Sequence, residues 1–360
     1  MRIRTEPIGS IPRPAALLSG MQAYVNGELN ASGLQALFDA ALRDTIARLE
    51  ATGSPVITDG EQTKPSFATY PIATATNISA DGVVIPFADG HTRQLPKLSA
   101  GPFRYTAFAA EYLKKARQLT TLPLKQAVIS ASALSLLYPP DGLEGYSREQ
   151  FINDLLNEAA ADIRNCFKAG AYNVQIDFTE ARLSLKLDPS GGILKAFIDL
   201  NNQVLSRFSE EERQLIGVHS CPGGDHDSTH SADIPYKDLL PELFRLNVGS
   251  FYLEYAGEVD KQSVLKSIRE NLKPNHTIFL GVTNVLKPRV ESPEEIRDFI
   301  LEASEIIPVA QLASTDDCGF SPFADDDSTA REIAFEKIGA RVRGTALAEE
   351  VLSKKQYTTS

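Results

Sequence analysis

Residues 147–177, SREQFINDLLNEAAADIRNCFKAGAYNVQID, contain a helix pattern followed closely by a strand pattern. Ser147 and Gln150 have the spacing of a capping box, in which each side chain bonds the other residue's backbone N–H at a helix start. Apolar residues then recur every three or four positions as far as Phe167, which is typical of a helix with one buried face. The segment Asn173–Asp177, with β-branched Val174 and Ile176 at alternate positions, predicts a strand.

Strand-like and helix-like segments alternate in this way along most of the chain. The expected strands are Glu6–Ile11, Pro55–Asp59, Gln126–Ser130, Asn173–Asp177, Leu215–His219, Ser250–Glu254, Thr277–Val282 and Val309–Ala313. Eight strands with helices between most neighbours favour a parallel sheet closed into a barrel. The sequence therefore predicts an α/β fold, a single (β/α)8 TIM barrel over residues 1–360. A two-domain doubly wound sheet is the alternative, although no linker marks a boundary.

One segment interrupts the alternation. Short extended runs in residues 77–98 are separated by the turn signals Asp81-Gly82 and Asp89-Gly90. Turns of this composition join antiparallel strands. We therefore expect an antiparallel β insertion near residues 77–98, placed over one end of the barrel.

Composition excludes several classes of function. The 36 basic and 47 acidic residues give a net charge of −11, which disfavours nucleic-acid binding. The longest nearly uncharged stretch, residues 127–140, is too short to span a membrane. The first residues contain no apolar run of a secretory signal, and three cysteines make no disulfide framework. We expect a cytoplasmic protein without membrane or nucleic-acid partners, whose thiols stay reduced.

Polar residues gather where the expected strands end. In a (β/α)8 barrel the carboxyl ends of the strands converge around one axis and form the active site. The residues at these ends are Ser10, Asp59, Glu61, Asp177, His219, Cys221, Glu254 and Cys318. Because the strands were assigned from hydrophobicity alone, this convergence indicates a functional site at that face.

Four of these residues have the chemistry of a zinc site. His219 and Cys221 are two apart at a strand end, so their side chains point the same way. Cys318 and Glu254 would complete a tetrahedral set, since zinc accepts nitrogen, sulfur and oxygen ligands. Sulfur-rich zinc sites are often structural, but those usually use close pairs such as Cys-x2-Cys. Cys166 lies on the apolar face of a helix and is expected to be a core thiol.

Such a site suits the activation of a thiol. Two thiolates and one carboxylate leave the metal a weak Lewis acid, but it can still bind a substrate thiol as the thiolate. Glu61 and Asp177 are candidates to hold the ammonium of an amino-acid substrate. His226 and His230 are either alternative ligands or part of a polar loop around the site.

The chain resembles the catalytic, carboxyl-terminal barrel of the cobalamin-independent methionine synthase family over almost its whole length. The matching motifs are Ile8-Gly9-Ser10 with Pro12, Asp59-Gly60-Glu61, Val174-Gln-Ile-Asp177, His219-x-Cys221, Glu254 and Asp317-Cys318-Gly319. The resemblance implies a (β/α)8 barrel with zinc held by His219, Cys221, Glu254 and Cys318. It also implies homocysteine as the methyl acceptor, bound by Ile8, Gly9, Ser10, Glu61 and Asp177, and a methyltetrahydrofolate as the donor.

The departures from the family pattern lie on the donor side. The family's pterin-stacking Trp has no counterpart, because the chain contains no Trp. The sequence after Asp177 is Phe-Thr-Glu180 rather than Glu-Pro, and the family's proton-donating His aligns with Leu286. The family's additional amino-terminal barrel is also not matched by these 360 residues. The resemblance therefore supports thiol activation more strongly than folate use.

The sequence thus predicts a zinc-dependent methyltransferase that converts homocysteine to methionine. One alternative is a zinc-dependent alkyl transferase that acts on another thiol, with an epoxide or a corrinoid methyl group as donor. Another is a decarboxylase-like barrel, or a non-catalytic protein, with a structural zinc. The general acid and the oligomeric state are not indicated by the sequence.

Overall fold

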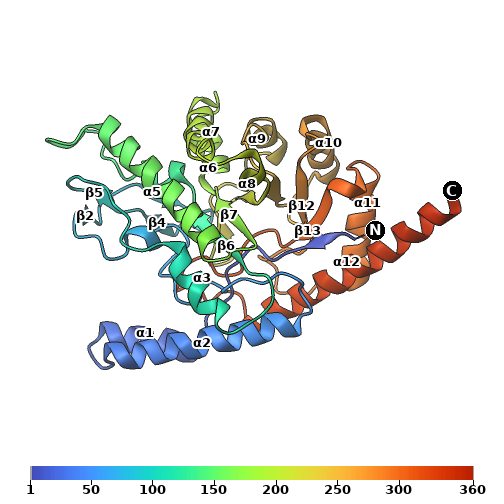
Figure 1. The fold of residues 1–360 in the computed structure, drawn as a ribbon, viewed down its shortest axis with the longest axis horizontal. Coiled ribbons are helices and arrows are strands. Elements are labelled where there is room, and N and C mark those ends of the chain that lie inside the picture. The colour runs from blue at the N-terminus through green and yellow to red at the C-terminus, as the bar shows by residue number, and fades with distance from the viewer. Residues whose placement is uncertain (1, 360) are drawn as a thin grey trace.

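The computed structural model describes residues 2–359, with side chains described as far as Lys354. Within these residues a curved parallel sheet of seven strands forms the centre, and helices surround it (Figure 1). The strands lie in the order β1-β13-β12-β11-β8-β7-β6. Their bounds are β1 Arg4–Thr5, β6 Lys125–Ile129, β7 Asn173–Asp177, β8 Ile216–Ser220, β11 Ser250–Leu253, β12 Thr277–Gly281 and β13 Leu312–Thr315.

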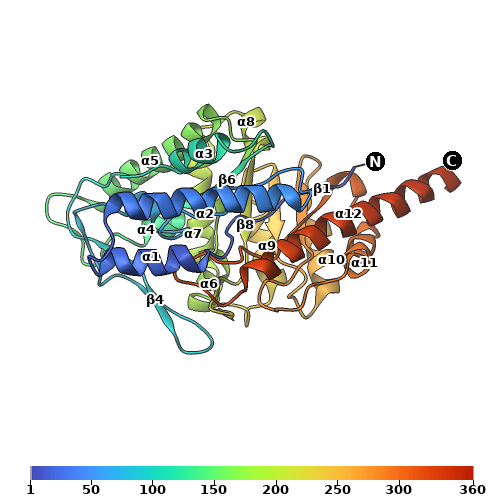
Figure 2. The ribbon, with the colours of Figure 1, turned by 90° about the horizontal axis from the view of Figure 1, so that it is seen from below.

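Helices occupy most of the segments between these strands. Their bounds are α1 Ala15–Val25, α2 Ala31–Ala51, α3 Ala109–Arg117, α4 Ala131–Ser135, α5 Arg148–Lys168, α6 Glu180–Leu187, α7 Gly192–Leu205, α8 Glu210–Gln214, α9 Tyr236–Leu243, α10 Lys261–Asn271, α11 Pro293–Ser304 and α12 Arg331–Thr359, with 3-10 turns η1 Tyr70–Ile72 and η2 Val309–Gln311. Figure 2 shows α1 and α2 side by side as a pair. Among the described residues, no helix has the length and apolar character needed to cross a bilayer.

Helix α5 shows how the local signals act. Gln150 N donates to Ser147 Oγ at 3.2 Å and Ser147 N donates to Gln150 Oε1 at 2.8 Å, so the expected capping box is present. The apolar face of the helix packs against the sheet and includes Cys166, which is 0% exposed. The expectation that Cys166 is a core thiol is confirmed.

Three expected strands differ from the structure. The first strand is Arg4–Thr5 rather than Glu6–Ile11. Val309–Gln311 is a 3-10 turn that starts after Pro308, and β13 begins only at Leu312. Pro55–Asp59 makes only a single parallel bridge, between Ile57 and Leu124. Hydrophobic pattern alone does not separate such short extended or turned segments from strands, because all of them bury apolar side chains.

The Pro55–Asp59 segment lies between the two edges of the sheet. At the β6 edge, Lys125 N donates to Ile57 O at 2.9 Å. On the side of the amino-terminal segment, Ile11 N donates to Gly60 O at 3.0 Å and Thr58 Oγ1 donates to Gly9 O at 2.8 Å. These contacts are consistent with a TIM-barrel-like arrangement.

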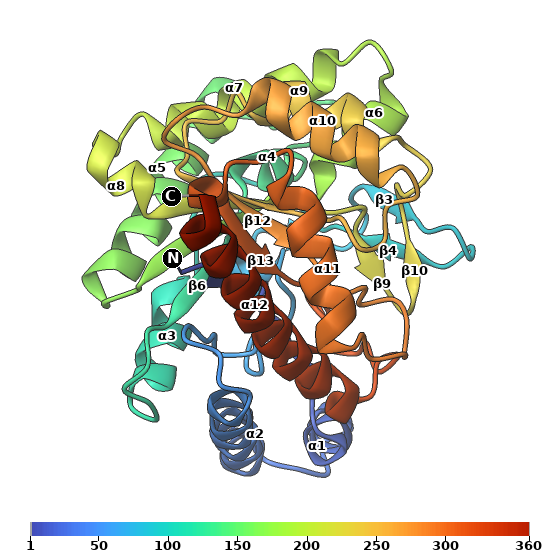
Figure 3. The ribbon, with the colours of Figure 1, turned by 90° about the vertical axis from the view of Figure 1, so that its right-hand side faces the viewer.

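Short antiparallel pairs lie outside the central sheet. Strand β2 (Ile78–Ser79) pairs with β5 (Lys97–Leu98), β3 (Val84–Pro86) with β4 (Thr92–Gln94), and β9 (Gly224–Asp225) with β10 (Ser228–Thr229). Figure 3 shows β3 and β4 close to β9 and β10. Ala88 N donates to Thr229 O at 2.9 Å and joins the two hairpins.

The last helix is attached to the sheet by a buried arginine. Arg341 of α12 donates to Glu6 O at 2.5 Å and forms an ion pair with Asp316 Oδ2 at 2.9 Å. Glu6 follows β1 and Asp316 follows β13, so one guanidinium joins the helix to two neighbouring strands. Both side chains of the ion pair are at most 1% exposed.

Replacing Arg341 by Met should therefore strongly destabilise the fold. The change leaves the Asp316 carboxylate buried without its cation, and breaking such a pair costs about 3–5 kcal/mol. Urea unfolding followed by circular dichroism measures the free energy of unfolding. Arg343→Met, at an exposed position of the same helix, is the control and should cost at most about 0.5 kcal/mol. Equal losses in the two variants would contradict the role of the ion pair.

Candidate metal centre

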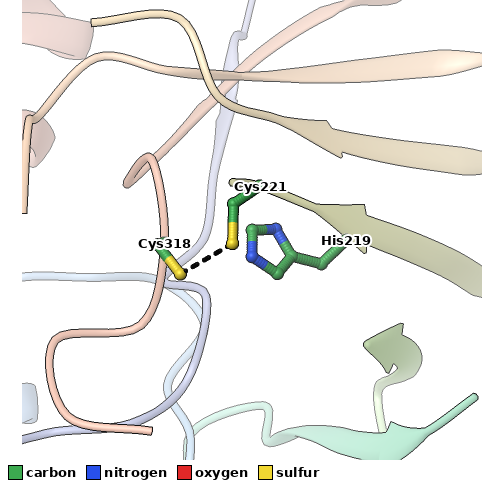
Figure 4. Close-up of side chains that lie close together, drawn as sticks. All are labelled: His219, Cys221 and Cys318. Atoms are coloured by element: carbon green, nitrogen blue, oxygen red, sulfur yellow. Dashed lines mark hydrogen bonds between the residues drawn. The ribbon is translucent and has the colours of Figure 1, made fainter. Parts of the chain in front are cut away.

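Three side chains with metal-binding chemistry meet at one buried point (Figure 4). His219 lies in β8, Cys221 follows that strand, and Cys318 lies in the loop after β13. Their ligand atoms lie within 4.8 Å of one another. The two sulfur atoms are 3.0 Å apart. The fold thus brings together residues that are about a hundred positions apart in the sequence.

The imidazole of His219 is oriented by the neighbouring strand. Its Nδ1 lies 3.3 Å from the backbone oxygen of Tyr252 in β11. Because a carbonyl only accepts hydrogen bonds, Nδ1 carries the proton and Nε2 presents its lone pair. Within the described chain, Nε2 is buried and has no hydrogen-bond partner. This is the geometry of a histidine that binds a metal through Nε2.

The two thiols are linked electrostatically. Their mutual hydrogen bond, together with burial, raises the pKa of Cys221 well above its usual value. The hydrogen bond from Cys221 holds the pKa of Cys318 well below its usual value, although burial opposes this. An unpartnered imidazole nitrogen beside two such sulfurs fits a dication that accepts nitrogen and sulfur ligands.

Glu254, the fourth predicted ligand, lies beside this group but outside the three-residue cluster. Its Oε2 accepts from Arg182 at 3.0 Å, and the same guanidinium contacts Glu258 Oε1 at 2.7 Å. Burial, with the charge of Asp317, raises the pKa of Glu254 well above its usual value. Glu254 and Cys318 line one small cavity. The role of Glu254 as a ligand stays a prediction.

Asp317 joins the loop of Cys318 to the loop of Glu254. Its carboxylate accepts the backbone N–H groups of Tyr255, Ala256 and Gly257 at 2.9, 2.9 and 2.7 Å. These three residues directly follow Glu254. The contact joins the two loops, so Asp317 supports the candidate site from outside the ligand set.

The five residues expected to contact the substrate all line one cavity. They are Ile8, Gly9, Ser10, Glu61 and Asp177. His219 and Cys318 line the same cavity, which measures about 620 Å³ including its opening to solvent. The structure thus places the predicted substrate residues and two of the predicted metal ligands around one space.

Lys64 is a buried cation that contacts Glu61 of this cavity and that the sequence analysis did not identify. Its Nζ donates to Glu61 Oε1 at 3.1 Å and to Ala127 O at 3.0 Å. Burial alone would lower the pKa of Lys64, but the charges of Glu61, Asp59 and Asp177 outweigh it and raise the pKa. Three carboxylates face one ammonium, so the region favours a further positive charge. The spacing of three residues between Glu61 and Lys64 was the available signal.

His226 and His230 do not join the cluster. His230 lines the cavity, its Nδ1 lies 2.5 Å from Ser231 Oγ, and burial lowers its pKa to about 4. A Cβ added at Gly223 would lie 1.8 Å from His230 Nε2, so this ring requires a glycine two residues after Cys221. His226 instead lies near Asp225 and Asp326.

The outer part of the cavity is roofed by the β3–β4 hairpin. Ile85 and Phe87 of this segment line the cavity together with Phe323. Arg93 of β4 donates two hydrogen bonds to Asp225, at 2.5 and 3.0 Å. It donates two more to Asp325, both at 2.9 Å. Its guanidinium also lies over the Phe323 ring, 4.2 Å from the ring centre. This apolar roof was not predicted as part of the site.

The fold and the cluster define a parallel α/β protein with a candidate metal centre of one histidine and two cysteines. The family model described as "Cobalamin-independent synthase, Catalytic domain" matches residues 3–332. The chain belongs to this family, which confirms the resemblance inferred from the motifs.

Curated relatives agree with this assignment, and a solved structure has a similar fold. A methionine synthase from Sulfurisphaera tokodaii is 22% identical over 99% of this chain and 95% of its own length. A 5-methyltetrahydropteroyltriglutamate–homocysteine methyltransferase from Ralstonia pickettii is 22% identical, and the alignment spans 39% of that protein. The structure of a B12-independent methionine synthase from Shewanella sp. W3-18-1 with selenomethionine superposes with a TM-score of 0.75 at 18% identity, over 98% of this chain and 100% of that chain.

The cluster should bind one metal ion per chain. Titration with Zn²⁺, followed by gel filtration and elemental analysis, should give one ion for the natural sequence. Cys221→Ser and Cys318→Ser should lose this ion and retain the fold. Cys166→Ser removes a core thiol and serves as the control, with full metal content expected. Unfolding of the metal-free protein would instead indicate a structural ion.

Glu254 and Glu258 provide a matched pair because both contact Arg182. If Glu254 is a ligand, Glu254→Gln should weaken metal affinity by about tenfold or more in competition with a chromophoric chelator. Glu258→Gln removes the other partner of Arg182 and should leave the affinity near that of the natural sequence. Equal effects of both changes would show that Glu254 acts only through Arg182.

Proposed function

We propose that residues 1–360 form one zinc-dependent methyltransferase barrel that methylates the thiol of homocysteine to give methionine. The proposal includes closure of the sheet into an eight-stranded barrel through the Pro55–Asp59 segment. The free cysteines suit a reducing compartment, so a cytoplasmic location belongs to the proposal. Family membership and the names of the relatives support the reaction class.

One observation carries the proposal. A buried imidazole nitrogen without a partner and two buried thiols form one group, and His219 and Cys318 of this group line the same cavity as Glu61 and Asp177. The first group suits a metal and the second suits an ammonium. Homocysteine is a short amino acid that carries a thiol at one end and an ammonium at the other.

The residues that would hold the zinc are His219, Cys221 and Cys318, with Glu254 as the fourth ligand. Zinc is preferred among dications because the donors are sulfur and imidazole in a site without a redox requirement. When bound, zinc would lower the pKa of the substrate thiol and leave its sulfur nucleophilic.

The protein residues position the acceptor. Asp177 and Glu61 would accept hydrogen bonds from the homocysteine ammonium, while the Ile8–Ser10 segment forms the adjacent wall. Burial raises the pKa of both carboxyl groups, and Lys64 opposes this shift at Glu61 and Asp177. Holding the thiol in line with the donor methyl would supply much of the rate through proximity and orientation.

The methyl transfer balances as a displacement. The thiol gives up its proton, and a sulfur lone pair forms the new S–CH3 bond as the N–CH3 bond of a methyltetrahydropteroyl donor breaks. The departing nitrogen keeps the electron pair of that bond and takes up a proton. Leu286 stands where the family has its proton-donating histidine, so no histidine supplies a proton from this position. Leu286 lines a small cavity together with Glu254 and Cys318.

The residues that roof the cavity are relevant to the identity of the methyl donor. Phe67, Phe87 and Phe323 offer an apolar surface, whereas Arg93, the guanidinium in this lining, is engaged by Asp225 and Asp325. A flat donor ring suits such a surface. A corrinoid methyl group or another activated methyl is the alternative donor, and a different thiol the alternative acceptor.

Single-turnover methyl transfer tests the proposal. The zinc-loaded protein is mixed with homocysteine and with methyltetrahydrofolate, its polyglutamate or methylcobalamin, and methionine is measured. We expect methionine from at least one donor and about a hundredfold loss or more in Cys318→Ser, since loss of thiol activation removes several kcal/mol of stabilisation. Absence of methionine with all three donors would overturn the methionine synthase assignment.

A further inference from the structure

Strand β7 carries three polar side chains at alternate positions, namely Asn173, Gln175 and Asp177. Alternate residues of a strand share one face, and all three side chains are buried. The interior of a parallel barrel is usually filled by branched apolar residues. On the neighbouring strand β6, Lys125 is also fully buried, at 0% exposure. The interior beneath the cavity is therefore unusually polar.

These residues form a directed chain of hydrogen bonds that ends at the cavity. Lys125 Nζ donates to Gln175 Oε1 at 2.8 Å, and Gln175 Nε2 donates to Asp177 Oδ1 at 2.7 Å. Burial lowers the pKa of Lys125 to about 7, and its protonated form can only donate hydrogen bonds, so this form fixes the Gln175 oxygen toward itself. The amide nitrogen must then face Asp177. With the amide reversed, its oxygen would face the carboxylate and repel it.

We infer that Lys125 and Gln175 are positioning residues that orient the Asp177 carboxylate toward the ammonium of the substrate, and so set the preference for an amino-acid thiol. The inference rests on the proposed function. Among the described residues, Gln175 is the side chain that donates to this carboxylate. With Oδ1 engaged in this way, Oδ2 is the oxygen left for a ligand in the cavity.

Stability alone does not account for the chain. Burying a lysine is costly, and apolar residues of similar volume in such positions often stabilise a protein. Lys125 lies 4.1 Å from the centre of the Tyr252 ring, but an apolar side chain would also pack there. A polar chain that reaches from the barrel interior to a cavity carboxylate is consistent with a role at the substrate.

A second polar group in the same interior provides the control. Tyr252 donates its hydroxyl to Glu6 Oε2 at 2.6 Å, and Asn173 Nδ2 donates to the same oxygen at 2.9 Å. None of these three residues lines the cavity. Tyr252→Phe removes a buried hydrogen bond close to Lys125, keeps the ring, and does not break the chain to Asp177.

The test compares two ligands that differ only in the ammonium. Calorimetry of the zinc-loaded protein gives the dissociation constants of homocysteine and of 4-mercaptobutanoate, which has the same thiol and carboxylate. We expect the natural sequence to prefer homocysteine. Lys125→Met and Gln175→Met should each reduce this preference about tenfold, because the hydrogen-bonded chain that orients the charged Asp177 carboxylate is broken. Tyr252→Phe should retain the preference.

Gln175→Met keeps the length of the side chain and adds no charge beside Asp177, so it tests the chain even if Lys125→Met fails to fold. In an Asp177→Asn background, Gln175→Met should change the preference no further. The positioning role is wrong if the natural sequence prefers homocysteine and the variants at Lys125 and Gln175 keep that preference. It is also wrong if these variants weaken the binding of both ligands equally. If the natural sequence binds neither ligand, the proposed function itself fails, and the inference with it.

Discussion

The parallel register of three neighbouring strands is the constraint on which the site depends. In the sheet, Asp177 of β7 pairs with His219 of β8, and His219 pairs with Tyr252 of β11. The pairing places a cavity carboxylate, an imidazole and the carbonyl that orients this imidazole at one level. A shift of β8 by one residue would turn His219 to the other face of the sheet and dismantle the arrangement.

The sequence was most informative where a strand ends in a polar residue. The strand Asn173–Asp177 and the positions of His219, Cys221 and Cys318 followed from short apolar runs and their flanking residues, and the structure gathers the three metal-binding side chains. Contacts between distant segments were not predictable. Arg182 reaches Glu254 across 72 positions, and no periodic pattern encodes such a pairing. The weak bridge at Ile57 was likewise indistinguishable from a full strand.

The carboxylates around the candidate centre share one feature. Glu61 is paired with Lys64, Glu254 with Arg182, and Asp316 with Arg341, and each cation is almost completely buried. Burial makes an unpaired carboxylate costly, so each cation allows a negative side chain to remain in the protein interior. Asp177 differs, because its described hydrogen-bond donor is an uncharged amide.

The β3–β4 hairpin closes the cavity chiefly through charged contacts. Arg93 holds Asp225, which is buried, and Asp325, whose side chain is 66% exposed. An interaction between partly exposed charges weakens as dissolved ions screen it, whereas apolar packing does not weaken in this way. The bond to exposed Asp325 is therefore the part of this attachment that dissolved ions weaken, whereas the bonds to buried Asp225 are largely shielded from them.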